Sequence, residues 1–437
     1  MSRVQPVRRK SARQPQGQGS PVARAITAPT TARRVLVISH SHPQLTKGGA
    51  EIAAYNQYLS CAATAPATTW FLGCSREAQG QHVGALFSQP FGPHEYVYAS
   101  GAFDWFNFSN MDPHFPAAFR ALLTELQPDE VHFHHYINIG LEALLHVKET
   151  LPNCRIEMTL HEYLAICHHY GQMVTKPALT LCYGSSPRKC NKCFPERPPE
   201  DFFLRKRYIE RFFDLVDAFV SPSHFLAARY SEWGIASNRI TVRENIVSVG
   251  PQADVPTKPP RAPDAPLRVG FFGQISKLKG IGVLLDAAEI LAEAGNHHVV
   301  FEIYGGDDGQ PPEFQAEFRE RIGKAGKNVI YFGPYAREQV RALMVALDVV
   351  LVPSIWWENS PLVILEAEAA GTAVVCSDIG GMAEKARSLD AVRSFPVGNA
   401  RCLVSELLSN PIIHKDGTGH VNSDRVRDLL ETKLRNR

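Results

Sequence analysis

Short apolar runs alternate along the chain with longer segments whose apolar residues recur at helical spacing. The first run, 35–39, is almost entirely apolar, as in parallel strands that are buried on both faces. A glycine-bearing loop follows it, and 51–59 then reads as a helix with an acid in its first turn. A strand, a loop and a helix in this order are typical of the opening of a nucleotide-binding α/β unit.

The same alternation continues through the first half of the chain. It predicts a parallel sheet with helices on both faces. The expected strands are 69–73, 130–134, 156–160 and 218–221, and the expected helices between them are 115–126 and 141–149.

A proline-rich stretch then interrupts the pattern, and the alternation restarts after it. We therefore expect two Rossmann-like domains, 34–250 and 267–437, joined by a linker at 251–266, with a ligand cleft at the carboxyl ends of their strands. In the second domain the expected strands are 268–273, 299–304, 329–332, 349–352 and 373–377, and the expected helices are 280–294, 312–323, 338–347, 361–370 and 423–433.

Composition adds an asymmetry to this picture. The 437 residues carry a net charge of +2, which gives no overall sign of a nucleic-acid partner. The stretch 1–33 is basic, contains no acid and is poor in apolar residues, so we expect a disordered arm. A weak hold on anionic lipid and an organelle transit peptide remain alternatives for it.

Two further features bear on the compartment. No apolar stretch approaches the roughly 20 residues that span a bilayer, and the nine cysteines come without an export signal. We therefore expect a cytoplasmic protein, with peripheral contact at a membrane as an option. The amphipathic segment 202–216 raises the same option, although a helix packed on the core explains it as well. The aromatic-rich stretch 91–119 fits either an acceptor-binding wall or a small core of its own.

The densest chemical signal lies at 357–366. Ser360 is a good N-cap and Pro361 a good first helical residue, so a helix is expected to begin there and to offer its free N–H groups to a pyrophosphate. Glu358 precedes this helix and Glu366 lies within it. Carboxylates at such a place can accept hydrogen bonds from the hydroxyls of a ribose or a sugar.

The spacing of Glu358 and Glu366 resembles the Glu-x7-Glu motif of the retaining GT-B glycosyltransferases, family 4 or group 1 type, which include sucrose synthase and many bacterial cell-envelope sugar transferases. The resemblance implies that Glu358 contacts the transferred sugar and Glu366 the ribose. It also implies a donor site that includes Ser360 and Leu362 at the helix start.

A second segment resembles the family's Gly-Arg-Leu…Lys-Gly element, whose arginine and lysine clamp the diphosphate. Here Gly273, Gln274 and Lys279 occupy the matching positions, so one positive charge is missing and the clamp depends on Lys279. Near the start of the chain, Gly48 and Gly49 resemble the family's first-loop glycines, which let the backbone approach the donor closely.

The family's Leu-His-Asp element is matched by Leu160, His161 and Glu162, and the resemblance places His161 at the donor sugar. Catalysis is then expected to involve His161, Glu358 and Lys279, with retention of configuration and without a divalent metal. Conventional acid–base roles stay open for His161, Glu162 and Glu358.

The expected substrates are a nucleotide-sugar donor and a hydroxyl acceptor on a glycan or lipid-linked intermediate, in the biosynthesis of glycan or cell-envelope polysaccharide. Two alternatives remain. A nucleotide-sugar epimerase of the same fold would act on the donor with no acceptor, and a non-catalytic scaffold would bind the nucleotide without turnover.

Four cysteines form a separate candidate site. Cys167, Cys182, Cys190 and Cys193 include a C-x2-C pair, which makes a half-site for structural zinc, and the basic residues beside them should favour thiolates. Buried free thiols are the alternative. Five histidines, of which two share a strand face, resemble a metal cluster, but packing and cleft lining are the favoured interpretation: His132, His134, His135, His168 and His169.

Overall fold

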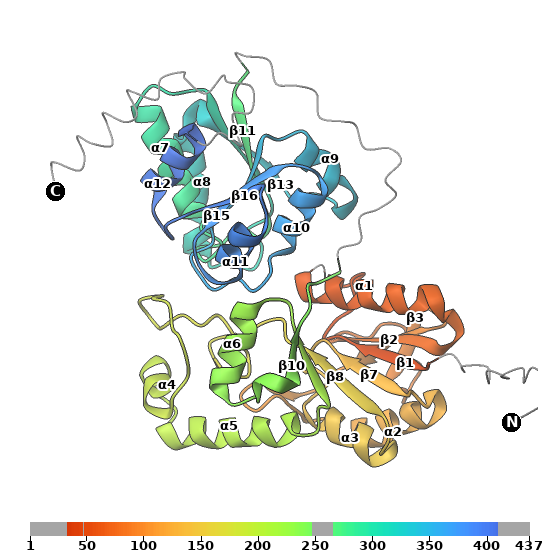
Figure 1. The fold of residues 1–437 in the computed structure, drawn as a ribbon. Helices are drawn as coiled ribbons and strands as arrows, with labels where there is room; N and C mark the ends of the chain where they lie inside the picture. The colour runs from red at the N-terminus through yellow and green to blue at the C-terminus, as the bar shows by residue number, and fades with distance from the viewer. Residues whose placement is uncertain (1–32, 47, 247–264, 410–437) are drawn as a thin grey trace, which may run out of the picture. The chain divides into compact units, whose positions relative to one another are not determined.

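The computed structural model describes residues 33–46, 48–246 and 265–409. In these residues, two separate α/β sheets follow one another along the chain (Figure 1). The expectations for the arm, most of the linker and the helix at 423–433 fall outside the described residues.

The first sheet has eight strands in the order β10-β9-β8-β7-β1-β2-β4-β3, all parallel except β3, which pairs antiparallel with β4. Its strands are β1 (Val35–Ile38), β2 (Thr69–Ser75), β3 (Phe87–Gly92), β4 (Glu95–Ala99), β7 (Glu130–Phe133), β8 (Arg155–Thr159), β9 (Ala218–Ser221) and β10 (Ile240–Val242). A small antiparallel ribbon pairs β5 (Phe103–Asp104) with β6 (Ser109–Asn110).

Helices cover both faces of this sheet. Figure 1 shows α1 on one side and α2 and α3 on the other. Apolar side chains of α1 pack on Val35, Val37 and Phe71, while α2 and α3 pack on the opposite face through the main core. The helices are α1 (Gly49–Thr64), η1 (Pro66–Thr68), α2 (Phe115–Leu126), α3 (Glu142–Thr150), α4 (Pro187–Cys193), α5 (Pro199–Phe213), α6 (His224–Trp233) and η2 (Ser237–Arg239).

The second sheet has six parallel strands in the order β13-β12-β11-β14-β15-β16. They are β11 (Leu267–Phe272), β12 (Val299–Tyr304), β13 (Val329–Gly333), β14 (Val349–Val352), β15 (Ala373–Ser377) and β16 (Val392–Phe395). The helices are α7 (Ile281–Glu293), α8 (Pro312–Lys324), η4 (Gly326–Asn328), η5 (Arg337–Gln339), α9 (Val340–Val345), α10 (Leu362–Ala369), α11 (Gly380–Ser388) and α12 (Ala400–Ser409).

Burial bears on two of the open alternatives. The helix expected at 202–216 forms as α5 and turns Phe202, Ile209 and Phe213 inward, although it leaves Phe203 and Leu204 exposed. In the aromatic stretch, most of the large rings are core residues, among them Tyr98, Phe106, Phe108 and Phe115. Among the described helices none is long and apolar enough to cross a bilayer.

Candidate functional site

Both sheets have a point at which the strand order reverses, and the expected site residues follow the strands at these points. In the second sheet β11 and β14 are neighbours, and the chain leaves them toward opposite edges. In the first sheet β1 and β7 have the same relation. Open α/β sheets bind ligands in the crevice at the carboxyl ends of such strand pairs.

Three donors converge on one carboxylate oxygen after β14. Glu358 Oε1 accepts from Lys279 Nζ at 2.6 Å, from Ser354 Oγ at 2.8 Å and from Trp356 Nε1 at 2.9 Å. The Glu358 side chain is 9% exposed and that of Lys279 34%. Three donors on one oxygen hold this carboxylate in one orientation, so its second oxygen keeps a defined direction. The structure thus joins Lys279 and Glu358, which the sequence had placed in separate elements.

Glycine makes the tight packing around this cluster possible. Gly280 has a φ of +76°, and a Cβ there would lie 1.9 Å from the carbonyl oxygen of Pro353. Gly381 donates its N–H to the Glu358 carbonyl at 2.8 Å, and a Cβ on it would lie 1.6 Å from the Asn359 oxygen. The loops that carry Lys279 and Glu358 therefore meet neighbouring backbone directly.

Glu366 lies on α10 with Arg337 as its partner, at 3.7 Å between Oε1 and Nη1. Burial raises the pKa of Glu366, and the charge of Arg337 opposes this rise. Burial and the nearby Glu366 raise the pKa of the Tyr335 hydroxyl to about 12. A partly buried carboxylate beside a cation and a ring suits a ligand that presents paired hydroxyls.

The expectation for the start of the helix needs correction. α10 begins at Leu362, and its N-cap is Pro361, without a side-chain cap. Ser360 does not cap the helix because its hydroxyl donates to the carboxylate of Glu244 instead. The N-terminal N–H groups of α10 consequently have no competing hydroxyl from Ser360.

Gln274 follows β11 and is exposed, as is expected of a residue at the mouth of a site. Its amide Nε2 donates weakly to the Asp308 carbonyl at 3.4 Å. Gly273 beside it has a φ of +128° and lies against Gly305, whose own Cβ position is occupied by the Gly273 oxygen. The backbone at Gly273 is thus held by a second glycine loop.

On the first sheet, Gly48 is the N-cap of α1 and Gly49 its first residue. Glu51, in the first turn, is buried and pairs with His40 at 3.1 Å. Burial would raise the pKa of Glu51, but the hydrogen bond and charge of His40 lower it. A Cβ at Gly49 would come within 3.7 Å of Leu362 Cδ1, so two expected donor-binding residues lie close together.

His161 follows β8 and belongs to a cluster of imidazoles. Its Nε2 is 2.9 Å from His134 Nδ1. His135 follows His134 in the sequence. Its Nδ1 accepts from the N–H groups of Tyr136 and Ile137, both at 3.0 Å, and its Nε2 lies 3.2 Å from Glu162 Oε1. Cleft lining, the favoured interpretation of His134 and His135, agrees with these bonds.

Hydrogen bonds also join residues that follow the two sheets. Asn359 Nδ2 donates to the backbone carbonyl of His161. Glu384 on α11 accepts from the N–H groups of His224 and Phe225, each at 3.0 Å, and so caps α6. The Glu358 loop and the His161 loop therefore contact one another.

The four cysteines are free thiols beside a cavity of about 250 Å³, but they do not form the expected metal site. No group of three or more His, Cys, Asp or Glu side chains among the described residues is arranged to hold a metal ion. Against the expectation of thiolates, burial raises the pKa of Cys167 to about 11 and also raises that of Cys190. Cys182 Sγ donates to the Gly184 carbonyl at 3.4 Å.

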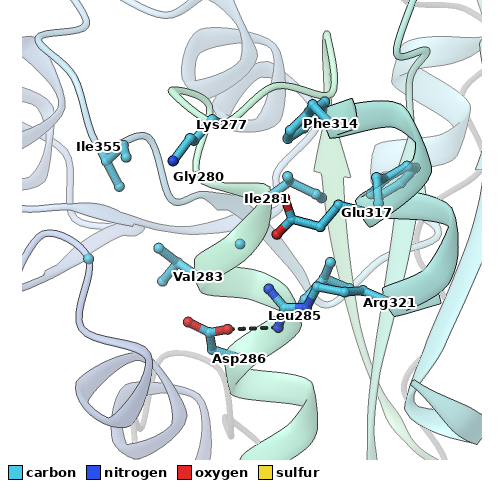
Figure 2. Close-up of a pocket in the computed structure, with 13 residues that line it drawn as sticks. Lys277, Gly280, Ile281, Val283, Leu285, Asp286, Phe314, Glu317, Arg321 and Ile355 are labelled. Atoms are coloured by element: carbon cyan, nitrogen blue, oxygen red, sulfur yellow. Dashed lines mark hydrogen bonds and ion pairs between the residues drawn. The ribbon is translucent and has the colours of Figure 1, made fainter. Parts of the chain in front are cut away.

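A second cavity, of about 360 Å³, lies between α7 and α8 (Figure 2). Lys277 and Ile355 on its wall belong to the loops that carry Lys279 and Trp356. Arg321 closes one side and is held by Asp286 at 2.7 Å. Glu358, Glu366 and Lys279 do not line this cavity, so it is separate from the candidate site, although two loops contribute to both.

Solved structures of similar fold cover nearly the whole chain. HepE from Anabaena, in complex with UDP and glucose, matches with a TM-score of 0.57 at 16% identity over 92% of this chain and 99% of HepE. Sucrose-phosphate synthase from Thermosynechococcus elongatus matches with a TM-score of 0.60 at 18% identity over 91% and 94%. These likenesses, with the two parallel sheets, define the class as GT-B.

Family models cover each half of the chain. Residues 77–250 match the glycosyltransferase family 4 model, and residues 266–409 match the model of glycosyl transferases group 1. The chain therefore belongs to the group 1 glycosyltransferases of the GT-B fold.

Curated relatives align over shorter stretches. A D-inositol 3-phosphate glycosyltransferase from Corynebacterium urealyticum is 37% identical over 118 residues, 26% of this chain and 27% of the relative. A lipopolysaccharide 1,2-N-acetylglucosaminetransferase from Salmonella typhimurium is 27% identical over 224 residues, 49% of this chain and 57% of the relative. The chain thus spans about a quarter of the first relative's length and somewhat more than half of the second's.

Proposed function

We propose that the protein transfers a sugar from a nucleoside diphosphate sugar to a hydroxyl acceptor with retention of configuration, in the biosynthesis of a glycan or cell-envelope polysaccharide. The observation that carries this proposal is the triple hydrogen bond that fixes Glu358 beside Lys279 after β14. It supplies a fixed anion for sugar hydroxyls next to a cation for the diphosphate.

The donor would lie along the carboxyl ends of β11 and β14. Glu366 would accept the ribose hydroxyls, and Lys279 with the N–H groups of α10 would face the diphosphate. Gly48, Gly49 and Gly273 would give the backbone room to approach it, and Gln274 would donate a neutral hydrogen bond where the family has an arginine. The names of the relatives, which act on an inositol phosphate and a lipopolysaccharide, support a hydroxyl acceptor.

The proposed chemistry is a substitution on one face of the transferred sugar. The bond from the anomeric carbon to the leaving phosphate oxygen breaks, and a bond to the acceptor oxygen forms on the same face. The acceptor's proton passes to the leaving phosphate oxygen. Lys279 and the α10 dipole would stabilise the charge that builds on the diphosphate, which is the largest contribution that such a site can make.

A thermal-shift screen against UDP, GDP, ADP and dTDP tests the donor site. A nucleotide at about 100 times its dissociation constant should stabilise the wild type by about 2.7 kcal/mol. Glu366→Ala should lose this shift, while Glu368→Ala, an exposed carboxylate on the same helix, should keep it. If no nucleotide stabilises the wild type, or if both variants respond alike, the proposed site is wrong.

Transfer itself needs a second measurement. With the nucleotide identified, release of nucleoside diphosphate from the matching sugar donor should require an acceptor hydroxyl. Conversion of the donor sugar without any acceptor would instead indicate an epimerase, and binding without turnover would indicate a scaffold.

A further inference from the structure

A chain of polar contacts runs along one face of the first sheet toward His161. Glu130, His132 and His134 alternate along β7 and the residue after it, so their side chains share a face and span about 13 Å. Gln57 on α1 lies over this face and bridges the two histidines. We call these five residues, Glu130, His132, Gln57, His134 and His161, the histidine chain.

Each link joins one atom of a residue to one atom of the next. His161 Nε2 is 2.9 Å from His134 Nδ1, and His134 Nε2 is 2.9 Å from Gln57 Oε1. Gln57 Nε2 contacts His132 Nδ1, and His132 Nε2 is 3.1 Å from Glu130 Oε1. Each of the three inner members thus uses one polar atom toward Glu130 and another toward His161.

Glu130 determines the direction of these bonds. Its carboxylate is held by Arg33 at 2.9 Å and by Arg155. Burial alone would raise the pKa of Glu130, but the contact with His132 and the charges of Arg33 and Arg155 lower it to about 2. An ionised carboxylate accepts hydrogen bonds and cannot donate them.

The remaining protons follow from this end point. When the His132 ring carries one proton, the contact with the carboxylate favours that proton on Nε2, so Nδ1 accepts from the Gln57 amide. The Gln57 oxygen then accepts from His134 Nε2, and His134 Nδ1 accepts from His161 Nε2. The reverse order would set a lone pair of His132 against the Glu130 carboxylate at 3.1 Å.

The imidazoles at the site end are neutral, so each carries one N–H. Burial first, and then the neighbouring His135, lower the pKa of His161 to about 4. Burial and the neighbouring His161 likewise hold the pKa of His134 well below its usual value. With its proton on Nε2, His161 has a lone pair on Nδ1.

We propose that the histidine chain fixes His161 in the tautomer whose Nδ1 accepts, so that His161 binds a hydroxyl of the transferred sugar as an acceptor. The identity of this ligand rests on the proposed function. Glu130, His132, Gln57 and His134 are then positioning residues, and His161 neither charges nor donates from Nδ1 at neutral pH. His161 is accordingly excluded as a general acid.

The tautomer can be read in the free protein by nitrogen-15 NMR of labelled histidine rings, with His161→Gln to assign the signals. The key variant is Glu130→Gln, whose amide can donate as well as accept and so permits the reverse order. The matched control is Glu157→Gln. Glu157 lies on the adjacent strand β8, directly opposite His132. It pairs with Arg155 and Arg243 and is not part of the histidine chain.

We expect a single tautomer of His161, protonated at Nε2, in the wild type and in Glu157→Gln, and a mixture in Glu130→Gln. Gln57→Leu, which removes a half-buried bridge without changing a charge, should also give a mixture and serves if Glu130→Gln folds poorly. A proton on Nδ1 in the wild type, or one unchanged tautomer in all variants, would overturn the proposal.

A binding comparison tests the role at the sugar. Glu130→Gln should weaken UDP-glucose about tenfold and leave UDP unchanged, since one hydrogen bond to the sugar is misdirected. Equal weakening of both ligands, or of neither, would contradict the sugar contact. If neither ligand binds the wild type, the proposed function fails for these donors, whereas the tautomer is still decided by the spectra.

Discussion

At the scale of single residues, the candidate site depends on carboxylates whose freedom has been removed. Glu358 is held by three donors on one oxygen. The side chain of Glu366 is mostly buried and has one arginine as its partner. The first arrangement holds the carboxylate in one orientation. The second leaves a carboxylate whose ionisation is disfavoured by burial until a ligand supplies hydroxyl donors.

A stability measurement tests whether burial disfavours the ionised form of Glu366. Because its pKa is raised in the folded protein, the stability that it contributes is complete below the usual glutamate pKa and is lost as the pH rises through the raised value. Glu366→Gln removes the titration. The melting temperature of the ligand-free variant should exceed that of the wild type at pH 7 and match it near pH 4, while nucleotide-induced stabilisation is lost. A lower melting temperature at pH 7 would contradict the argument.

At the scale of elements, apolar patterning was a reliable guide to the strands. All ten expected strands form, with ends that differ by at most two residues. Parallel strands that are buried on both faces appear in the sequence as short, nearly continuous apolar runs, which makes them easy to predict. The pattern missed β3, whose Phe87–Gly92 segment contains a proline and faces solvent, and it missed α6 and α11, which lack a long apolar stripe. It also missed the strands β4, β5, β6, β10 and β16 and the helices α4 and α12. Edge strands and short helices receive their order from neighbours that a local pattern does not contain.

The site was foreseeable to a similar extent. Motif order selected Lys279, Glu358, Glu366 and His161, and their roles stay predictions. Lys279, Glu358 and His161 lie in loops after strands, and Glu366 lies on α10. The contribution of Gln57, His132 and Glu130 was missed because these residues come together only when α1 packs on β7. The one available signal was the alternation of Glu130, His132 and His134 along a strand.

The turn into α7 yields a prediction at this scale. Gly280→Ala adds left-handed strain, about 1–2 kcal/mol, to a clash with the Pro353 oxygen at 1.9 Å, for a total loss of roughly 3 kcal/mol in unfolding free energy. Gly326→Ala is the control, because Gly326 has a φ of +65° with nothing within 4 Å of the added Cβ. Urea denaturation should show the control losing only about 1 kcal/mol. Equal losses would mean that the contact with Pro353 is unimportant.

At the scale of the whole molecule, the two α/β sheets carry different parts of the candidate site. The carboxylates follow the second sheet, and the histidines follow the first. Hydrogen bonds from Asn359 and to Glu384 connect the loops of one sheet with those of the other. The site is therefore complete only when these loops are in contact.

Hydrogen exchange can test whether this contact persists in solution. Glu384→Ala should speed exchange of the His224 and Phe225 amides about tenfold, because each loses a charge-assisted hydrogen bond worth roughly 1.5 kcal/mol. The Leu226 amide, capped by Ser223 within the same helix at 3.2 Å, provides the internal reference and should keep its rate. Unchanged rates at all three amides would show that α6 and α11 are apart in solution.

The histidine chain should also affect how fast the tautomers of its imidazoles exchange. If one member reversed alone, two donors or two acceptors would face each other at both of its ends. Full reversal removes these mismatches but sets a lone pair of His132 against the Glu130 carboxylate, so only the forward order has no unfavourable contact. An isolated imidazole exchanges its tautomers freely, whereas His161 should hold one arrangement through many catalytic cycles, a persistence supplied by a carboxylate at the far end of a strand.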